Sequence, residues 1–138
     1  MSAGPQRRDV LRVAGAAAVA VPVLTACGRG SEPTGSSTTA ADGAVRLDVT
    51  GLEEGQSRVY PSARVVVSRP SGQDYVVFDS RCPHQGCAVS EREDDKLVCP
   101  CHASYFDPAT GEVLSGPAAT GLTVVPSSVE GSEIVIRG

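Results

Sequence analysis

Both histidines of the chain and four of its five cysteines lie in two short blocks, and this concentration points to metal chemistry. The first block is residues 82–87 (CPHQGC) and the second is residues 99–104 (CPCHAS). Each block offers one thiol and one imidazole at ligand spacing, C-x-H in the first and C-x-x-H in the second. Each block also contains a second cysteine beyond this set. Two thiolates and two imidazoles suit either an iron–sulfur centre or zinc.

A structural zinc site is the main alternative, because zinc also takes four sulfur and nitrogen ligands. Zinc gives no role to the second cysteine of each block. Covalent haem attachment does not fit, since residues 99–102 (CPCH) are one residue short of the C-x-x-C-H pattern. The sequence also contains no glycine-rich nucleotide-binding pattern, so its chemistry depends on this metal centre.

The two blocks together resemble the Rieske iron–sulfur family, in the form that carries an extra disulfide, with C-x-H-x-G-C followed by C-x-C-H-x-S. The similarity covers residues 82–104 and weakly includes residues 116–118 (GPA), which resemble the proline loop that covers the cluster in that family. Members hold a 2Fe–2S cluster with two cysteines on one iron and two histidines on the other. Carried over residue by residue, the resemblance implies Cys82 and Cys99 on one iron, His84 and His102 on the other, and a disulfide between Cys87 and Cys101.

The resemblance also implies what tunes the reduction potential. Two imidazoles in place of two thiolates make the cluster less negative, which favours uptake of an electron. Ser104 matches a serine whose hydroxyl donates to a cluster sulfide in the higher-potential members. Phe106 stands where many of those members have a tyrosine, and Tyr105 is one residue out of register. We therefore expect a potential below that of the tyrosine-bearing members.

The fifth cysteine, Cys27, ends a segment with the features of an export signal. Arg7 and Arg8 form a twin-arginine start, and the apolar run at 13–26 is shorter than the roughly 20 residues of a spanning helix. Residues 24–27 (LTAC) resemble a bacterial lipobox with Cys27 as the lipid-modified residue. Residues 1–27 are therefore predicted to be a Tat-type lipoprotein signal, with an uncleaved anchor as the alternative. Either form leaves the globular part outside the cytoplasmic membrane.

The remainder divides into a linker and one small domain. Residues 28–43 are rich in Gly, Ser, Thr and Ala, which predicts a flexible linker, and residues 44–138 are enough for one domain. Short alternating or β-branched runs between turn signals predict an all-β fold. The resemblance implies a Rieske-type antiparallel β-sandwich with a small cluster-binding subdomain inserted at about 80–117. The predicted strands are 45–49, 64–68, 75–78, 96–99, 112–114, 122–125 and 133–136. The expected core side chains are Leu47, Val65, Val67, Val76, Phe78, Leu122, Val124, Ile134 and Ile136.

The charge of the chain limits its partners. The net charge is −4, and the signal contributes +2, so the rest of the chain carries −6. A domain this acidic, without a basic stripe, is not expected to bind nucleic acid. The acidic run at 91–95 is either a docking face for a basic partner or a solvated turn.

The sequence therefore predicts one-electron transfer by a 2Fe–2S cluster on the outer face of the cytoplasmic membrane. The chain would act as a carrier or as the small subunit of a respiratory-type redox chain, rather than as a stand-alone enzyme. The alternatives are the Rieske subunit of a quinol-oxidising cytochrome bc-type complex, that of an arsenite-oxidase-like enzyme, and a structural zinc domain. Expected partners are membrane-associated or extracytoplasmic redox proteins, together with the membrane itself through a lipid anchor.

Overall fold

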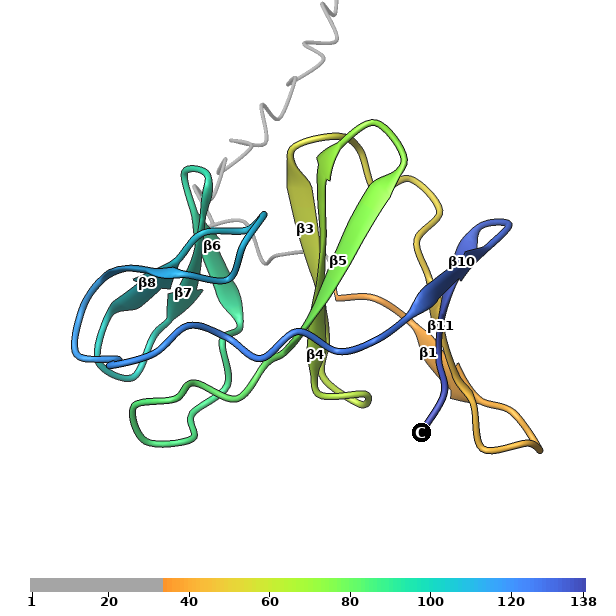
Figure 1. Cartoon of the computed structure of the whole chain (residues 1–138), viewed down its shortest axis with the longest axis horizontal. Helices are drawn as coiled ribbons and strands as arrows, with labels where there is room; N and C mark the ends of the chain where they lie inside the picture. The colour runs from red at the N-terminus through yellow and green to blue at the C-terminus, as the bar shows by residue number, and fades with distance from the viewer. Residues whose placement is uncertain (1–33) are drawn as a thin grey trace, which may run out of the picture.

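The computed structural model describes residues 34–138, and this part of the chain is built of β-strands without helices (Figure 1). The strands form three antiparallel sheets. The predicted all-β, antiparallel class is therefore confirmed. The first sheet has the order β1 (Ser37–Thr39), β2 (Val45–Asp48), β11 (Glu133–Ile136), β10 (Ser128–Glu130). The second is β3 (Gln56–Tyr60), β4 (Val65–Ser71), β5 (Asp74–Asp79), and the third is β6 (Glu91–Glu93), β7 (Lys96–Cys99), β8 (Ser104–Phe106), β9 (Val113–Ser115).

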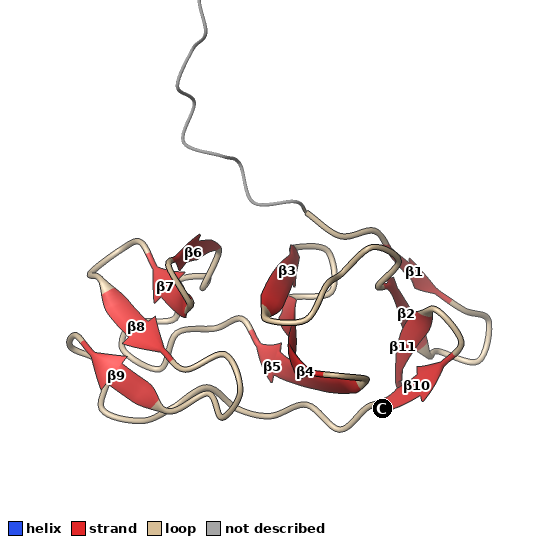
Figure 2. Ribbon diagram, turned by 90° about the horizontal axis from the view of Figure 1, so that it is seen from above, coloured by secondary structure: helices blue, strands red, loops and turns tan. Residues whose placement is uncertain are grey.

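The middle sheet β3–β5 lies between the other two sheets in Figure 2 and separates two hydrophobic cores. Successive side chains of β4 point to opposite faces, so Val65 and Val67 enter one core while Val66 enters the other. This explains why β4 reads as a continuous apolar run instead of an alternating one. One core packs the middle sheet against β2 and β11, and the other packs it against β7 and β8.

The sheet β6–β9 forms a small lobe within the range 80–117 that the sequence predicted for the inserted subdomain. Figure 1 shows that the chain leaves β5, builds this lobe and then returns across the middle sheet to β10. The returning segment bonds to β5 on the way: the Asp79 N–H donates to the Thr123 carbonyl and the Val125 N–H to the Val77 carbonyl, both at 2.8 Å. The small lobe is thus attached to the middle sheet by both of its chain connections.

The predicted strand at 122–125 is wrong. These residues make a single bridge, Phe78 to Val124, and then Pro126 removes the next backbone donor. The expected burial of Val124 is also wrong, because that side chain is 55% exposed. Leu122 is buried as expected.

The predicted linker at 28–43 does not hold for residues 34–43. β1 lies in this range and pairs with β2, and the Gly35 N–H donates to the Val59 carbonyl at 2.8 Å. Gly35 packs against the Tyr60 ring, where an added Cβ would lie 2.0 Å from the Tyr60 Cε1 atom. Residues 28–33 and the predicted signal at 1–27, with Cys27, lie outside the described residues. Among residues 34–138 no helix is long and apolar enough to cross a membrane.

Candidate metal centre

The first block lies in a loop between β5 and β6, residues 80–90, which we call the first loop. Its backbone folds back on itself, because the Cys82 N–H donates to the Cys87 carbonyl at 2.7 Å and the Gly86 N–H to the Cys82 carbonyl at 2.9 Å. At the base of the first loop, the Val89 N–H donates to the Ser80 carbonyl at 2.7 Å. Gly86 has a φ of 77°, a left-handed conformation that favours glycine. The sequence therefore forms a tight, internally bonded turn that carries Cys82 and His84.

The second block forms the turn between β7 and β8, residues 99–104, which we call the second loop. Cys99 is the last residue of β7, and its carbonyl accepts the Ala103 N–H at 3.1 Å. Strand pairing of Cys99 with Ser104 holds the base of the turn. His102 is exposed at the tip of this loop.

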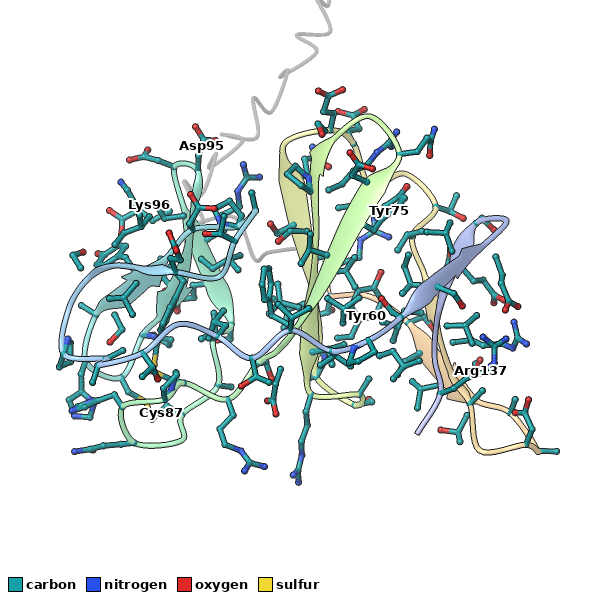
Figure 3. All side chains as sticks on the ribbon, in the orientation of Figure 1. Tyr60, Tyr75, Cys87, Asp95, Lys96 and Arg137 are labelled. Atoms are coloured by element: carbon teal, nitrogen blue, oxygen red, sulfur yellow. A yellow bond between two sulfur atoms is a disulfide. The ribbon has the colours of Figure 1, made fainter. Side chains whose placement is uncertain are left out.

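A disulfide between Cys87 and Cys101 joins the two loops, as the resemblance predicted. Figure 3 places Cys87 and this disulfide at the lower end of the small lobe. The His84 and His102 rings are in contact edge to face, with centroids 4.8 Å apart and planes at 89°. His84 is half-buried, whereas the thiols of Cys82 and Cys99 belong to residues only 2% exposed. The two loops therefore combine two buried thiols with two adjacent imidazoles, of which that of His102 is exposed and that of His84 half-buried.

The donor set fits a metal group that takes thiolates on its inner side and imidazoles on its outer side. Cys82 and Cys99 are free cysteines within the core that the small lobe shares with the middle sheet. Burial raises the pKa of the Cys99 thiol, and the neighbouring Cys82 thiol adds to this shift. A bound cation has to reverse it, because a thiol ligates metal as the thiolate.

One close group of potential metal-ligating atoms includes the two disulfide sulfurs. Among residues 34–138, the three donor atoms that lie within 4.8 Å of one another are those of Cys87, Cys99 and Cys101. Two of these sulfurs are already bonded to each other in the disulfide. This group therefore offers a metal only one free thiol, that of Cys99.

A third segment, residues 116–118, packs against the second loop, where the resemblance placed the proline loop. A Cβ on Gly116 would lie 2.4 Å from the Ala103 carbonyl oxygen and 2.6 Å from the Ser104 Cα, so only glycine allows this approach. The Ala118 N–H donates to the buried Ser104 hydroxyl at 3.2 Å. The oxygen acts as acceptor in this bond, so the hydroxyl proton of Ser104 stays available to another acceptor.

The alternation of β8 separates Phe106 from Tyr105. Ser104 and Phe106 face the core, where Phe106 is fully buried, while Tyr105 faces outward. The Tyr105 hydroxyl donates to the Glu93 carboxylate at 3.0 Å, and this bond raises the pKa of Tyr105. Tyr105 therefore cannot supply the hydroxyl that Phe106 lacks.

Three relatives show what the chain is similar to. A protein described as a candidate Rieske subunit of respiratory nitrate reductase from Haloferax mediterranei is 41% identical over 45% of this chain and 29% of its own length. The ferredoxin subunit of 3-phenylpropionate/cinnamic acid dioxygenase from Shigella boydii is 36% identical over 64% of this chain and 86% of its own length. The cytochrome b6-f complex iron-sulfur subunit 1 of Nostoc sp. strain PCC 7120 is 38% identical over 55% of this chain and 42% of its own length. The chain thus matches less than half the length of the first and third of these proteins.

The profile of the Rieske [2Fe-2S] domain matches residues 43–126. This range begins just before β2 and ends after the segment that returns across β5, so it includes both loops and residues 116–118. A Rieske domain holds a 2Fe–2S cluster, and the zinc alternative is therefore set aside. The chain belongs to the Rieske [2Fe–2S] domain family.

Proposed function

We propose that this chain transfers single electrons through a 2Fe–2S cluster held by the first and second loops. The proposed ligands are Cys82 and Cys99 on one iron and His84 and His102 on the other. The observation that carries the proposal is the combination of two adjacent imidazoles and two buried, free, neighbouring thiols on loops that the Cys87–Cys101 disulfide joins. When bound, such a cluster accepts and releases one electron at a time.

The thiols, the imidazoles and the disulfide have different roles in the proposed site. The buried thiols of Cys82 and Cys99 would hold the cluster against the core that the small lobe shares with the middle sheet. The imidazole edges lie at the surface, so they offer the shortest path for an electron to a docked partner. The disulfide holds both loops in one arrangement, which keeps the imidazoles oriented for that exchange.

The Ser104 hydroxyl is expected to set the potential. We predict that Ser104→Ala lowers the midpoint potential and that Phe106→Tyr raises it, each by about 60 mV, the equivalent of one net hydrogen bond for a one-electron centre. A donor to a cluster sulfur stabilises the reduced, more negative form, which raises the potential. Protein-film voltammetry of the wild type and both variants measures the shifts.

Tyr105→Phe is the matched control, because it removes a hydroxyl that bonds to Glu93 on the outer side of β8. Its potential should equal that of the wild type. An unchanged or higher potential in Ser104→Ala would show that this hydroxyl does not donate to the cluster.

We also propose that the domain works on the outer face of the cytoplasmic membrane, attached by lipid at Cys27. The twin arginines and the LTAC run support this location. The Cys87–Cys101 disulfide is compatible with it, since disulfides persist in oxidising compartments.

Export is expected to depend on the arginine pair and anchoring on Cys27. The double variant Arg7→Lys/Arg8→Lys should accumulate in the cytoplasm, and Cys27→Ala should leave a longer precursor without an acyl group. Cell fractionation and mass spectrometry of the purified chain provide the measurements. Normal export of the double variant would contradict the Tat route, and unchanged processing of Cys27→Ala would favour an uncleaved anchor.

Two settings for the electron transfer are supported by different relatives. The nitrate reductase and cytochrome b6-f relatives favour a subunit or carrier of a respiratory-type chain, with a cytochrome bc-type or arsenite-oxidase-like complex as specific forms. The dioxygenase ferredoxin matches over most of its own length and favours a soluble ferredoxin role as the second candidate. Fractionation decides between them: a chain in the membrane fraction that co-migrates with redox subunits on native gels supports the first, and a chain in the cytoplasm supports the second.

A further inference from the structure

Two arginines near the first loop have no partner among the described residues. Of the seven arginines in residues 34–138, five use their guanidinium groups in hydrogen bonds or ion pairs with nearby carbonyls and carboxylates. These are Arg46, Arg58, Arg69, Arg92 and Arg137. Arg64 and Arg81 make no such side-chain bond within residues 34–138, and both are exposed. Their charges are therefore available to another molecule.

Both arginines line one groove, which has a volume of about 460 Å³. The groove lies between the turn that joins β3 to β4, residues 61–64, and the first loop. Arg64 comes from the turn, while Arg81, Gly86 and Ala88 come from the first loop. Figure 1 shows the turn and the first loop at the same end of the molecule. Arg81 directly precedes Cys82, and Gly86 directly precedes Cys87 of the disulfide, so the groove adjoins the metal centre.

The groove also contains one carboxylate, that of Asp79. Its Oδ1 accepts the Arg81 backbone N–H at 2.8 Å, and it forms no ion pair with either arginine among the described residues. The groove therefore keeps a net positive charge, in a chain whose part beyond residue 27 carries −6.

The backbone at Arg64 supports a role for its side chain. Arg64 has a φ of 54°, a left-handed conformation in which glycine or asparagine is less strained than arginine. The Ser80 N–H donates to the Arg64 carbonyl at 2.9 Å and ties the turn to the start of the first loop. The turn thus holds a long cationic side chain beside the metal centre at the expense of some backbone strain.

The negative charge of the small lobe lies at its other end. Figure 3 shows Asp95, in the turn between β6 and β7, and Lys96, the first residue of β7, at the end of the lobe opposite Cys87. Glu93 and Asp95 of this acidic run are engaged by Tyr105 and Arg92, respectively. The run is therefore a partly bonded turn at the far end of the lobe from Cys87, whereas the arginine groove is lined by residues of the first loop.

We propose that the groove between Arg64 and Arg81 docks the acidic surface of a redox partner, whose carboxylates enter it while the partner's redox centre faces His84 and His102. This proposal rests on the proposed electron-transfer function. The charge separation along the domain would turn its arginine end toward an acidic partner during approach, which raises the association rate at low ionic strength.

Electron transfer to small probes of opposite charge tests the docking surface. The full chain with its cluster is reduced and mixed in a stopped-flow instrument with anionic hexacyanoferrate(III) or with cationic tris(phenanthroline)cobalt(III). Arg64→Gln and Arg81→Gln should each slow the anionic reaction about threefold at low ionic strength, and the double variant about tenfold. The cationic reaction should not slow, and high salt should remove the difference. Lys96→Gln is the control, because it removes the same charge at the far end of the lobe.

Calorimetric titration with hexaglutamate peptide tests the groove without electron transfer. The wild type should bind the peptide, the double variant should lose this binding, and Lys96→Gln should retain it. Equal anionic rates and equal peptide binding in the double variant and Lys96→Gln would overturn the docking proposal. A chain that binds hexaglutamate through the arginines but contains no iron or labile sulfide would refute the proposed function and leave an anion-binding groove.

Discussion

Replacement of Cys99 by alanine is expected to abolish cluster binding. The Cys99 thiol is at the end of β7, inside the core shared by the small lobe and the middle sheet, next to the Cys82 thiol. Apart from Cys82, which is itself a proposed ligand, no free cysteine lies within residues 34–138 to replace Cys99. One iron would then keep a single protein ligand. Iron and acid-labile sulfide of the purified chain should fall from about two of each per chain to near zero.

Val98→Ala is the matched control for this variant. Val98 is the buried neighbour of Cys99 on β7, so its truncation also removes buried apolar surface from this strand while leaving all four proposed ligands in place. Val98→Ala should lose stability but keep its iron and sulfide. Full iron and sulfide in Cys99→Ala would mean that the ligand set is wrong. His84→Cys and His102→Cys should lower the potential in any variant that keeps the cluster, because a thiolate adds negative charge.

The second large effect is expected from loss of the disulfide. Cys87→Ala/Cys101→Ala removes the covalent link between the two loops that carry all four proposed ligands. Closing a loop of this length, with a separation of 14 residues, contributes about 3 kcal/mol in the chain-entropy account. The variant should lose its visible absorbance to a chelator many times faster than the wild type, with a lower unfolding temperature.

Reduction of the disulfide in the wild-type chain should reproduce this behaviour if the bond itself is responsible. The control is the double variant Ser62→Ala/Ser115→Ala, which changes two exposed side chains outside the two loops and should keep the wild-type rate. A Cys87→Ala/Cys101→Ala variant with the wild-type rate of cluster loss would contradict the idea that the disulfide holds the loops together.

The longer apolar strands could be predicted from the sequence, whereas the short polar ones could not. β4 and β5 carry uninterrupted apolar runs, Val65–Val67 and Tyr75–Phe78, because their faces contribute to two cores, and such runs stand out in the sequence. β6 and β10 have three residues each and are largely exposed, so their strand state depends on pairing with β7 and β11. β1 lies in a segment whose composition is typical of a linker. Its order comes from pairing with β2, a contact that composition does not reveal.

The candidate site was predictable to the extent that its residues are close in sequence. The two blocks, the disulfide pairing and the contact of residues 116–118 with the second loop all follow from the motif. The different directions of Tyr105 and Phe106 follow from the alternation of a strand that the sequence did not predict. Arg64 and Arg81 are 17 positions apart and have no motif in common, so their shared groove is visible only in the folded chain.

The central claim is that Cys82, His84, Cys99 and His102 hold a 2Fe–2S cluster, and one measurement tests it most directly. The purified chain is analysed for iron, zinc and acid-labile sulfide, and its electron-spin resonance spectrum is recorded after reduction. We predict about two irons and two sulfides per chain, with the signal of a mixed cysteine–histidine cluster that disappears in Cys99→Ala. Stoichiometric zinc without acid-labile sulfide or a reduced-state signal would contradict the account.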